Sequence, residues 1–206
     1  AEAQMEKIVE LPLENLYPFK NHPFRVVDDD AMKEAAESIA KHGVLVPAIA
    51  RPRVEGGYEL ISGHRRKRAS ELAGKDTMPV IVRNLDDDAA TIIMVDSNIQ
   101  RENILPSERA MALKLTLEAL KRQGARNDLT SCQVGTKLRA DERLAESAGD
   151  SARNVQRYIR LTELVPEFLD MVDNRKLAFN PSVELSYLKP EEQHQLVEAM
   201  DLEQTT

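Results

Sequence analysis

The chain has 206 residues, of which 42% are hydrophobic and 31% charged, and it carries a formal net charge of −7 with no tryptophan. This composition indicates a soluble protein of one or two domains with a mainly aliphatic core. It predicts no membrane span, because no apolar run approaches the roughly 18 residues required, and no secretory signal pattern is evident. The single cysteine, Cys132, cannot form an internal disulfide and has no metal-ligand companions, which favours a cytoplasmic protein. The negative charge argues against non-specific nucleic-acid binding, so the location of the basic residues matters more.

The first half of the sequence predicts strands and helices in alternation. Short apolar or alternating runs bounded by turn residues predict strands at residues 7–13, 45–53, 57–62 and 78–85. Helical spacing of apolar residues predicts helices at residues 28–43, 65–74 and 86–100. An aspartate among residues 28–30 and Gly43 are the start and stop signals of the first helix. This part of the chain is therefore expected to have an α/β (α+β) fold.

The second half carries helical signals and no strand signals after residue 104. Residues 106–124 predict a long helix, with Ser107 as its cap and Gly124 at its end. Residues 125–138 are polar and irregular and are expected to form a surface insertion, and four or five shorter helices follow. We therefore expect two domains, an α/β domain at residues 1–104 and an all-helical domain at residues 105–206.

Residues 141–161, DERLAESAGDSARNVQRYIRL, have the pattern of a helix-turn-helix. Gly149 permits the left-handed turn, and Ser151 is a natural cap for the second helix. That helix carries side chains suited to base edges and phosphates, namely Arg153, Asn154, Arg157 and Arg160. Together with Ser151 they are the candidate DNA-binding residues. The alternative is an ordinary helical hairpin with a solvated basic face.

A basic cluster, GHRRKRA, occupies residues 63–69 between a predicted strand and a predicted helix. Glycine permits close approach of a ligand, and helix N-termini bind anions through unpaired N–H groups. Arginine presents forked donors that match phosphate oxygens, so Gly63, Arg65, Arg66 and Arg68 suggest a polyphosphate cradle. The alternative is a solvated basic helix, or a set of ion pairs with Asp28–Asp30 or Asp86–Asp88.

Two sequence boxes in this order resemble the ParB family of plasmid and chromosome partition proteins. They read ELISGHRRKRASELAG at residues 59–74 and NIQRENILPSERA at residues 98–110. Upstream, NHPFR at residues 21–25 and SIAKHGVLVPAIARP at residues 38–52 are similar to further segments of the family. Downstream, residues 142–177 look like its helix-turn-helix and the helices that follow. The resemblance covers about residues 8–188.

The resemblance implies a ParB/sulfiredoxin-like N-terminal domain followed by an all-α helix-turn-helix domain. In that family the first domain binds CTP with Mg²⁺ and closes against its copy in a homodimer, forming a clamp on double-stranded DNA. The helical domain binds a centromere-like site, and a ParA-type ATPase is the partner. By position, the implied nucleotide-binding residues are Arg25, Gly43, Gly63, His64, Arg65, Arg66, Arg68, Asn98, Gln100 and Arg101. No metal-ligating residue is assigned.

Three departures from the family pattern bear on function. Ser97 stands where the family has an acidic residue associated with metal and hydrolysis, so the chain is expected to be at most a weak CTPase. Val46 precedes Pro47 where many relatives carry glutamine, and the 125–138 segment is longer than usual. The family's C-terminal dimerisation domain and ParA-stimulating segment are not recognisable, which suggests a piece of a longer protein.

The sequence leaves three functional hypotheses. The first is a sequence-specific partition protein of a plasmid, mobile element or chromosome, gated by CTP. The second is a ParB-like transcription or replication regulator without a working nucleotide switch, which Ser97 favours. The third is an enzyme, but the turn that resembles sulfiredoxin has Ser62-Gly63-His64 and no cysteine. A nuclease is not indicated either, because the histidines at positions 22, 42, 64 and 194 are scattered.

Overall fold

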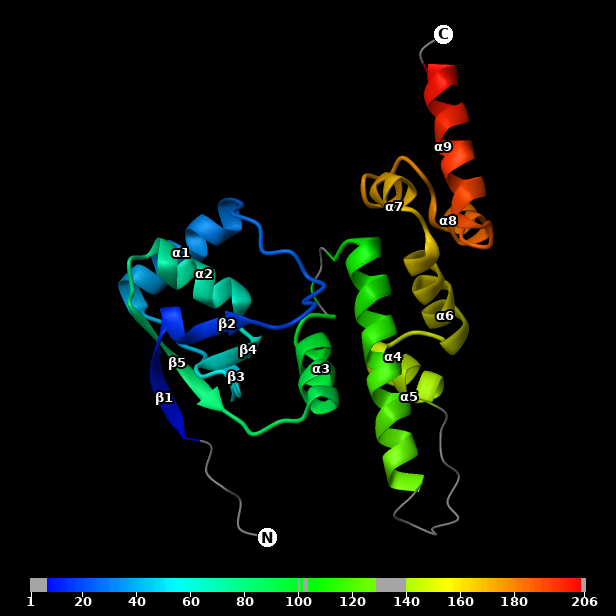
Figure 1. Cartoon of the computed structure of the whole chain (residues 1–206). Coiled ribbons are helices and arrows are strands. Elements are labelled where there is room, and N and C mark those ends of the chain that lie inside the picture. The colour runs from blue at the N-terminus through cyan, green and yellow to red at the C-terminus, as the bar shows by residue number, and fades with distance from the viewer. Residues whose placement is uncertain (1–6, 100, 102–103, 129–139, 205–206) are drawn as a thin grey trace. The chain divides into compact units, whose positions relative to one another are not determined.

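The computed structural model describes residues 7–99, 101, 104–128 and 140–204, and it divides into two compact units (Figure 1). The first unit comprises Ala1–Ser97 and the second Asn98–Thr206. The division falls seven residues before the end of the predicted α/β domain at residue 104 (104 − 97 = 7).

The first unit is built on a five-stranded mixed sheet in the order β1-β5-β3-β4-β2. The strands are β1 (Ile8–Pro12), β2 (Leu16–Pro18), β3 (Ala48–Pro52), β4 (Tyr58–Ser62) and β5 (Thr77–Val82). Strand β3 is parallel to β5 and antiparallel to β4, β1 is antiparallel to β5, and β2 is parallel to β4. Four strands match the prediction. The short edge strand β2 was not predicted.

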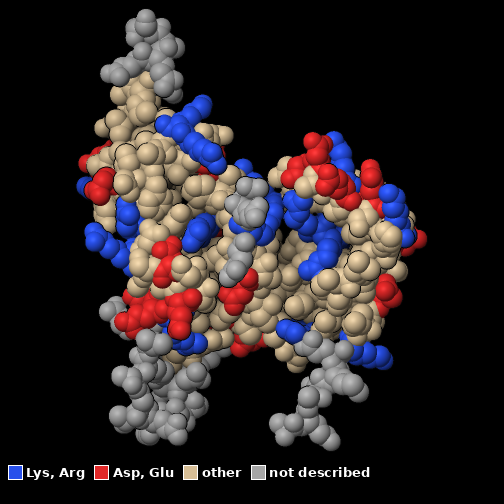
Figure 2. Space-filling view, turned by 180° about the vertical axis from the view of Figure 1, so that it is seen from behind, with Lys and Arg blue, Asp and Glu red and all other residues tan. Residues whose placement is uncertain are grey.

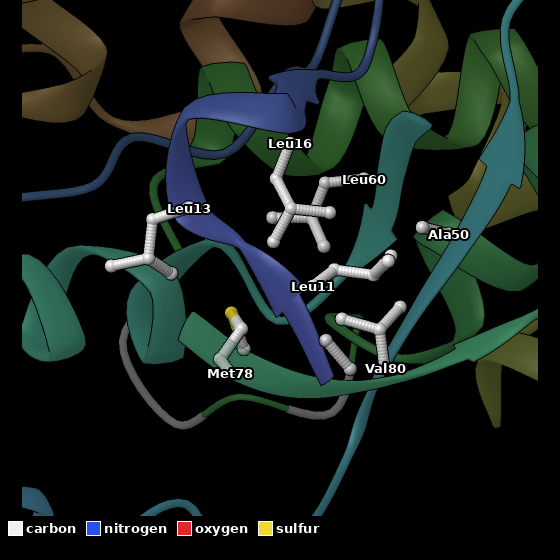
Figure 3. Close-up of a cluster of buried hydrophobic side chains, with 8 residues drawn as sticks. Leu11, Leu13, Leu16, Ala50, Leu60, Met78 and Val80 are labelled. Carbon is white, nitrogen blue, oxygen red and sulfur yellow. The ribbon is translucent and has the colours of Figure 1, made fainter. Parts of the chain in front are cut away.

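One face of the sheet carries the apolar core of the unit (Figure 3). Alternate positions of β3 and β5 point into it, as the two-residue period of a strand requires. The cluster consists of Leu11, Leu13, Leu16, Ala48, Ala50, Leu60, Met78 and Val80, all buried. Side chains from the first and last strands of the sheet therefore pack in the same cluster.

In the described part of the unit, three α-helices accompany the sheet, α1 (Asp30–His42), α2 (His64–Leu72) and α3 (Asp87–Asp96), and a short 3-10 helix, η1 (Leu13–Asn15), lies between β1 and β2. Helix α1 begins where Asp29 accepts a hydrogen bond from the Met32 N–H at 2.8 Å, and it ends at Gly43 with φ 71°. It packs against α2 through Met32, Ile39 and Ala69. The three predicted helices are present in this unit, but α3 ends at Asp96 rather than at residue 100, so that part of the prediction is wrong.

Every element assigned in the described part of the second unit is helical. These elements are α4 (Pro106–Asp128), α5 (Ala140–Ala148), α6 (Ala152–Arg160), η2 (Leu161–Glu163), α7 (Pro166–Asp173), α8 (Phe179–Leu185) and α9 (Pro190–Gln204). Their core includes Ala110, Leu161, Phe168 and Val183. Gln193 is buried with them, accepting from the Val165 N–H at 2.9 Å and donating to the carbonyls of Glu163 and Leu188.

Two details of α4 differ from the prediction. The helix does not end at Gly124 but continues to Asp128, so that prediction is wrong, because a single glycine weakens a helix without having to stop it. Ser107 lies inside the first turn, after Pro106. Its N–H and hydroxyl both donate to the Asp173 carboxylate, at 3.0 and 2.5 Å, so a residue of α7 covers this end of α4. The rest of the predicted insertion, with Cys132, lies outside the described residues.

Candidate functional site

Gly63 forms the corner between β4 and α2, at the start of the basic cluster. Its φ of 111° lies in the region that favours glycine. A Cβ built at this position would stand 2.8 Å from the Cβ of Ala48, which is fully buried on the central strand β3. Glycine is thus required here by the backbone and by the contact with β3. From the sequence, Gly63 was expected only to permit the close approach of a ligand.

The N-terminus of α2 has the features of an anion-binding helix end. No side chain caps it at Gly63, and its first turn, which begins at His64, contains no acidic residue. The N–H groups at the start of a helix lack partners within the helix, and the helix dipole favours negative charge there. This end of α2 can therefore receive a phosphate or carboxylate oxygen.

The three arginines of the cluster have different surroundings. Arg66 donates from one guanidinium nitrogen to the carbonyl oxygens of Val46 and Pro47, both at 2.7 Å. It is partly buried, and burial lowers its pKa, although a guanidinium remains charged at neutral pH. Arg66 therefore connects α2 to the loop that follows Gly43, rather than pointing freely at a ligand.

Arg65 and Arg68 face carboxylates in the segment before α1. Arg68 forms a forked pair with Asp28, its Nε donating to Oδ1 at 3.0 Å and an Nη to Oδ2 at 2.5 Å. Arg65 lies 3.4 Å from Asp29. The Arg68 guanidinium lowers the pKa of Asp28, and the two carboxylates of Asp28 and Glu71 raise the pKa of Arg68. For Arg65 and Arg68 the structure has the ion pairs with Asp28–Asp30 that the alternative interpretation expected. Asp87 pairs instead with Arg51, at 2.7 Å.

His64, the first residue of α2, is held as a neutral ring. Its Nε2 accepts from the Phe19 N–H at 3.5 Å, and its ring centroid lies 3.8 Å from that of His22. Burial first, and then the nearby His22 and Lys67, lower the pKa of His64 to about 3. His22 in turn donates from Nδ1 to the Phe24 carbonyl at 2.8 Å, if that nitrogen carries the proton. The ring pair thus joins the 19–24 segment, which leads to Arg25, to the start of α2.

The remaining residues of the predicted nucleotide site lie on other segments of the chain. Arg25 is exposed between that segment and Asp28, and Gly43 caps α1, its N–H donating to the Ile39 carbonyl. Asn98 and Arg101 belong to the second unit, where the Arg101 N–H donates to the Asn98 carbonyl at 3.1 Å. Gln100 lies outside the described residues. Within the first unit, the structure therefore assembles the Gly63–Arg68 cluster with the Asp28 segment and the Gly43–Pro47 loop.

Basic and acidic side chains are interspersed on the face shown in Figure 2. The basic cluster of α2 fits this pattern, because the negative charges of Asp28 and Asp29 lie within 3.4 Å of it. The positive charge of the cluster is therefore local, in a protein whose net charge is −7.

In the second unit, α5 and α6 are joined by the short turn Gly149–Ser151. Gly149 has φ 63°, and the Ser151 hydroxyl accepts from the Asn154 N–H at 3.2 Å. Asp150 accepts from the Asn154 side chain at 2.8 Å and from Arg109 of α4 at 3.2 Å, which fixes the turn against α4. An open depression of about 410 Å³ lies at this end of α6, lined by Asp150, Ser151, Arg153, Asn154 and Arg157.

The basic side chains of α6 do not all point to solvent. Arg153 is exposed and has no hydrogen-bond or ion-pair partner among the described residues. Arg157 donates to the Asn180 side chain at 2.5 Å and lies over the Phe179 ring. Arg160 is partly buried, donates to the side chain and carbonyl of Ser186, and lies over the Tyr187 ring. Arg153 is thus the most available of the predicted DNA-binding arginines, and Arg160 the least.

Within the described chain, no helix is both long and apolar enough to cross a bilayer. In the same residues, no three His, Cys, Asp or Glu side chains are grouped so that they could hold a metal ion. Ser97 ends α3, its hydroxyl donating to the Met94 carbonyl at 2.9 Å.

Comparison with known proteins agrees with this fold. Residues 1–99 match the ParB N-terminal domain family. The chain is similar to the probable chromosome-partitioning protein ParB of Pseudomonas putida, with 36% identity over 159 residues, 77% of this chain and 49% of that protein. It is similar to stage 0 sporulation protein J of Bacillus subtilis, with 33% identity over 184 residues, 89% of this chain and 59% of that protein. The chain thus spans between about half and three fifths of the length of these relatives.

Among solved structures, the chain resembles the C-terminally truncated chromosome-partitioning protein ParB of Caulobacter crescentus complexed to the centromeric parS site. The TM-score is 0.56 and the identity 25%, over 93% of this chain and 92% of that one. Mixed α/β architecture in the first unit, the matched domain and these relatives define the class of protein. The chain belongs to the ParB family.

Proposed function

We propose that this chain is a sequence-specific DNA-binding partition protein, with a helical unit that binds a centromere-like site through α6. The observation that carries this proposal is the depression at the start of α6, lined by the exposed Arg153, by Asn154 and by Arg157. Arginine and asparagine at the start of a recognition helix match guanine and adenine edges in the major groove. The resemblance to a ParB bound to parS supports the same assignment.

Binding of a labelled DNA site to single variants tests this assignment. Arg153→Ala and Arg157→Ala should each weaken specific binding by roughly 1–3 kcal/mol if the side chains read bases. A side chain that contacts only phosphate should instead weaken binding to all sequences and reduce the salt slope by about one. Lys176→Ala, which removes an exposed charge outside α5 and α6, is the control. Binding that is unchanged in both arginine variants would remove the recognition helix from α6.

We further propose that the first unit binds CTP with Mg²⁺ and thereby controls the clamping of DNA by a homodimer. The uncapped end of α2 and the guanidinium of Arg65 would contact phosphate oxygens, as could Arg68 once it leaves Asp28. Arg66 would keep the Val46–Pro47 carbonyls beside the site. The bound nucleotide would supply the negative charge that this helix end favours, and with Ser97 in place of the acidic residue we expect at most slow hydrolysis.

Calorimetric titration with CTP, ATP and Mg²⁺ tests nucleotide binding, and crosslinking between copies of the first unit tests the clamp. CTP, and not ATP, should bind and increase the crosslinking, and Arg65→Ala should weaken both effects. No heat of binding for either nucleotide would reject the switch. The same proposal places the chain in the cytoplasm, where it would bind a plasmid, a mobile element or a chromosome. A ParA-type ATPase would be its partner.

The second candidate is a DNA-binding regulator of the same family that has no nucleotide switch. Two observations favour it: the forked pair between Arg68 and Asp28, and the serine at position 97. It predicts DNA affinity that falls steeply with salt and does not respond to CTP. The same DNA-binding assay with and without CTP separates the two candidates.

A further inference from the structure

Three consecutive aspartates precede and begin α1, and each has a different role. Asp29 is the N-cap, accepting from the Met32 N–H at 2.8 Å, so it is part of the helix start. Asp30 is exposed and pairs with Lys33 on the same helix. Asp28 makes its two hydrogen bonds, among the described residues, to Arg68 on α2. Asp29 also lies 3.4 Å from Arg65, so Asp28 is the one of the three whose hydrogen bonds, among the described residues, go to the basic cluster alone.

The contact between Asp28 and Arg68 has the geometry of anion recognition. The two carboxylate oxygens face Nε and an Nη of the guanidinium at 3.0 and 2.5 Å, the forked arrangement that arginine also offers to phosphate. A carboxylate and a phosphate cannot occupy the same two donors at once. The other Nη of Arg68 donates to Glu71 at 3.3 Å. A phosphate group that takes the forked pair of donors must therefore displace Asp28.

We propose that Asp28 is an affinity-determining residue of the nucleotide site: an internal anion that holds Arg68 until a phosphate group replaces it. This inference rests on the nucleotide binding proposed above. Asp28 opposes binding in two ways, since its contact with Arg68 must be broken and its negative charge then remains beside the bound phosphates.

The position of Asp28 allows this exchange. The Asp28 and Arg68 side chains are 49% and 39% exposed, so separation of the pair does not uncover a buried charge. Asp28 also lies one residue before the N-cap, so its side chain can move away while Asp29 continues to hold the start of α1. A ligand with several phosphate charges replaces one carboxylate more readily than a monophosphate does, so the pair should favour triphosphates over monophosphates.

The test compares CTP binding, in the presence of Mg²⁺, by the wild-type chain, Asp28→Asn and the matched control Asp30→Asn. Both variants remove one negative charge, from positions two residues apart, and asparagine keeps the shape of the side chain. Asp28→Asn should lower the Kd for CTP by on the order of fivefold, the scale of a single exposed ion pair, while Asp30→Asn should leave it nearly unchanged. Asp28→Ser is the second variant, with thermal unfolding of each protein as the check on folding.

The outcomes separate this inference from the proposed function. CTP binding by the wild type with an equal or higher Kd in Asp28→Asn and Asp28→Ser would overturn the role of Asp28 and leave the nucleotide site intact. An equal gain in Asp30→Asn would also overturn it, because a general charge effect would explain the result. No CTP binding by any of the proteins would overturn the proposed function and, with it, this inference.

Discussion

Replacing Gly63 with alanine tests the corner between β4 and α2 without removing a charged group, although the added Cβ would also stand 3.4 Å from the guanidinium carbon of Arg66. Two costs are expected. A non-glycine residue at φ 111° carries a backbone strain of about 1–3 kcal/mol. The new Cβ would also stand 2.8 Å from the Cβ of Ala48, and overpacking against a buried strand costs about 1–3 kcal/mol. Alanine also lowers the conformational entropy of the unfolded chain, which stabilises the folded state by about 0.4–1 kcal/mol and offsets part of these costs. The free energy of unfolding of the first unit should therefore fall by about 1–6 kcal/mol, and by about 3 kcal/mol at the middle of each range.

Gly74→Ala is the matched control. Gly74 also has a positive φ, 66°, but an added Cβ would meet nothing within 4 Å. The difference between the two variants in urea unfolding, followed by circular dichroism, isolates the contact with β3 and should be about 2 kcal/mol. Combining Gly63→Ala with Ala48→Gly should return part of that loss in a double-mutant cycle. A difference below about 0.5 kcal/mol would show that α2 shifts freely away from β3 and would refute the argument.

Three further predictions concern stability. Gln193→Leu should lower the free energy of unfolding by about 2–4 kcal/mol, because it leaves the buried Val165 N–H and the carbonyls of Glu163 and Leu188 unpaired. Thermal unfolding measures this loss, and Gln195→Leu, at an exposed position, is the control. Ser151→Ala should cost about 1 kcal/mol through the lost cap of α6, and a cost no larger than that of Ser147→Ala would contradict the capping role. For His64, the folded pKa of about 3 lies below the ordinary 6.5, so the unfolded chain binds more protons between these values and stability falls as pH falls through this window. At pH 5 the free energy of unfolding should be about 2 kcal/mol lower than at neutral pH because of His64. His64→Gln should flatten the pH dependence of the free energy of unfolding. An unchanged slope would show that the ring is not held neutral.

The features that the sequence predicted well are those that depend on neighbouring residues. The first helix has its aspartate cap and its terminal glycine at the expected positions, because capping needs only residues within one turn. Strand β2 was missed, because it has three residues, ends in Pro18 and exists through its pairing with β4. Gly124 was given too much weight, because the packing that sustains α4 past a glycine is not visible in a local window.

The candidate site shows the same division. The position of the basic cluster at a strand-to-helix corner followed from the order of residues. The partner of each arginine did not follow from that order. Arg68 pairs with Asp28, which is 40 residues away along the chain, and Arg66 donates to the Val46 carbonyl, which is 20 residues away. The sequence allowed ion pairs with either of two acidic clusters, and the structure selects the one before α1. The family match adds the class of protein.

The order of strands in the first unit also affects how the sheet forms during synthesis and where the chain can be truncated. Strand β1, the first along the chain, pairs with β5, the last, and β3 lies between β5 and β4. During synthesis, β1 has no neighbour until residues 77–82 have left the ribosome, so its hydrogen bonds form late. A truncation that stops before Thr77 should leave an unpaired, aggregation-prone edge, whereas a fragment that includes Val82 retains every strand of the sheet.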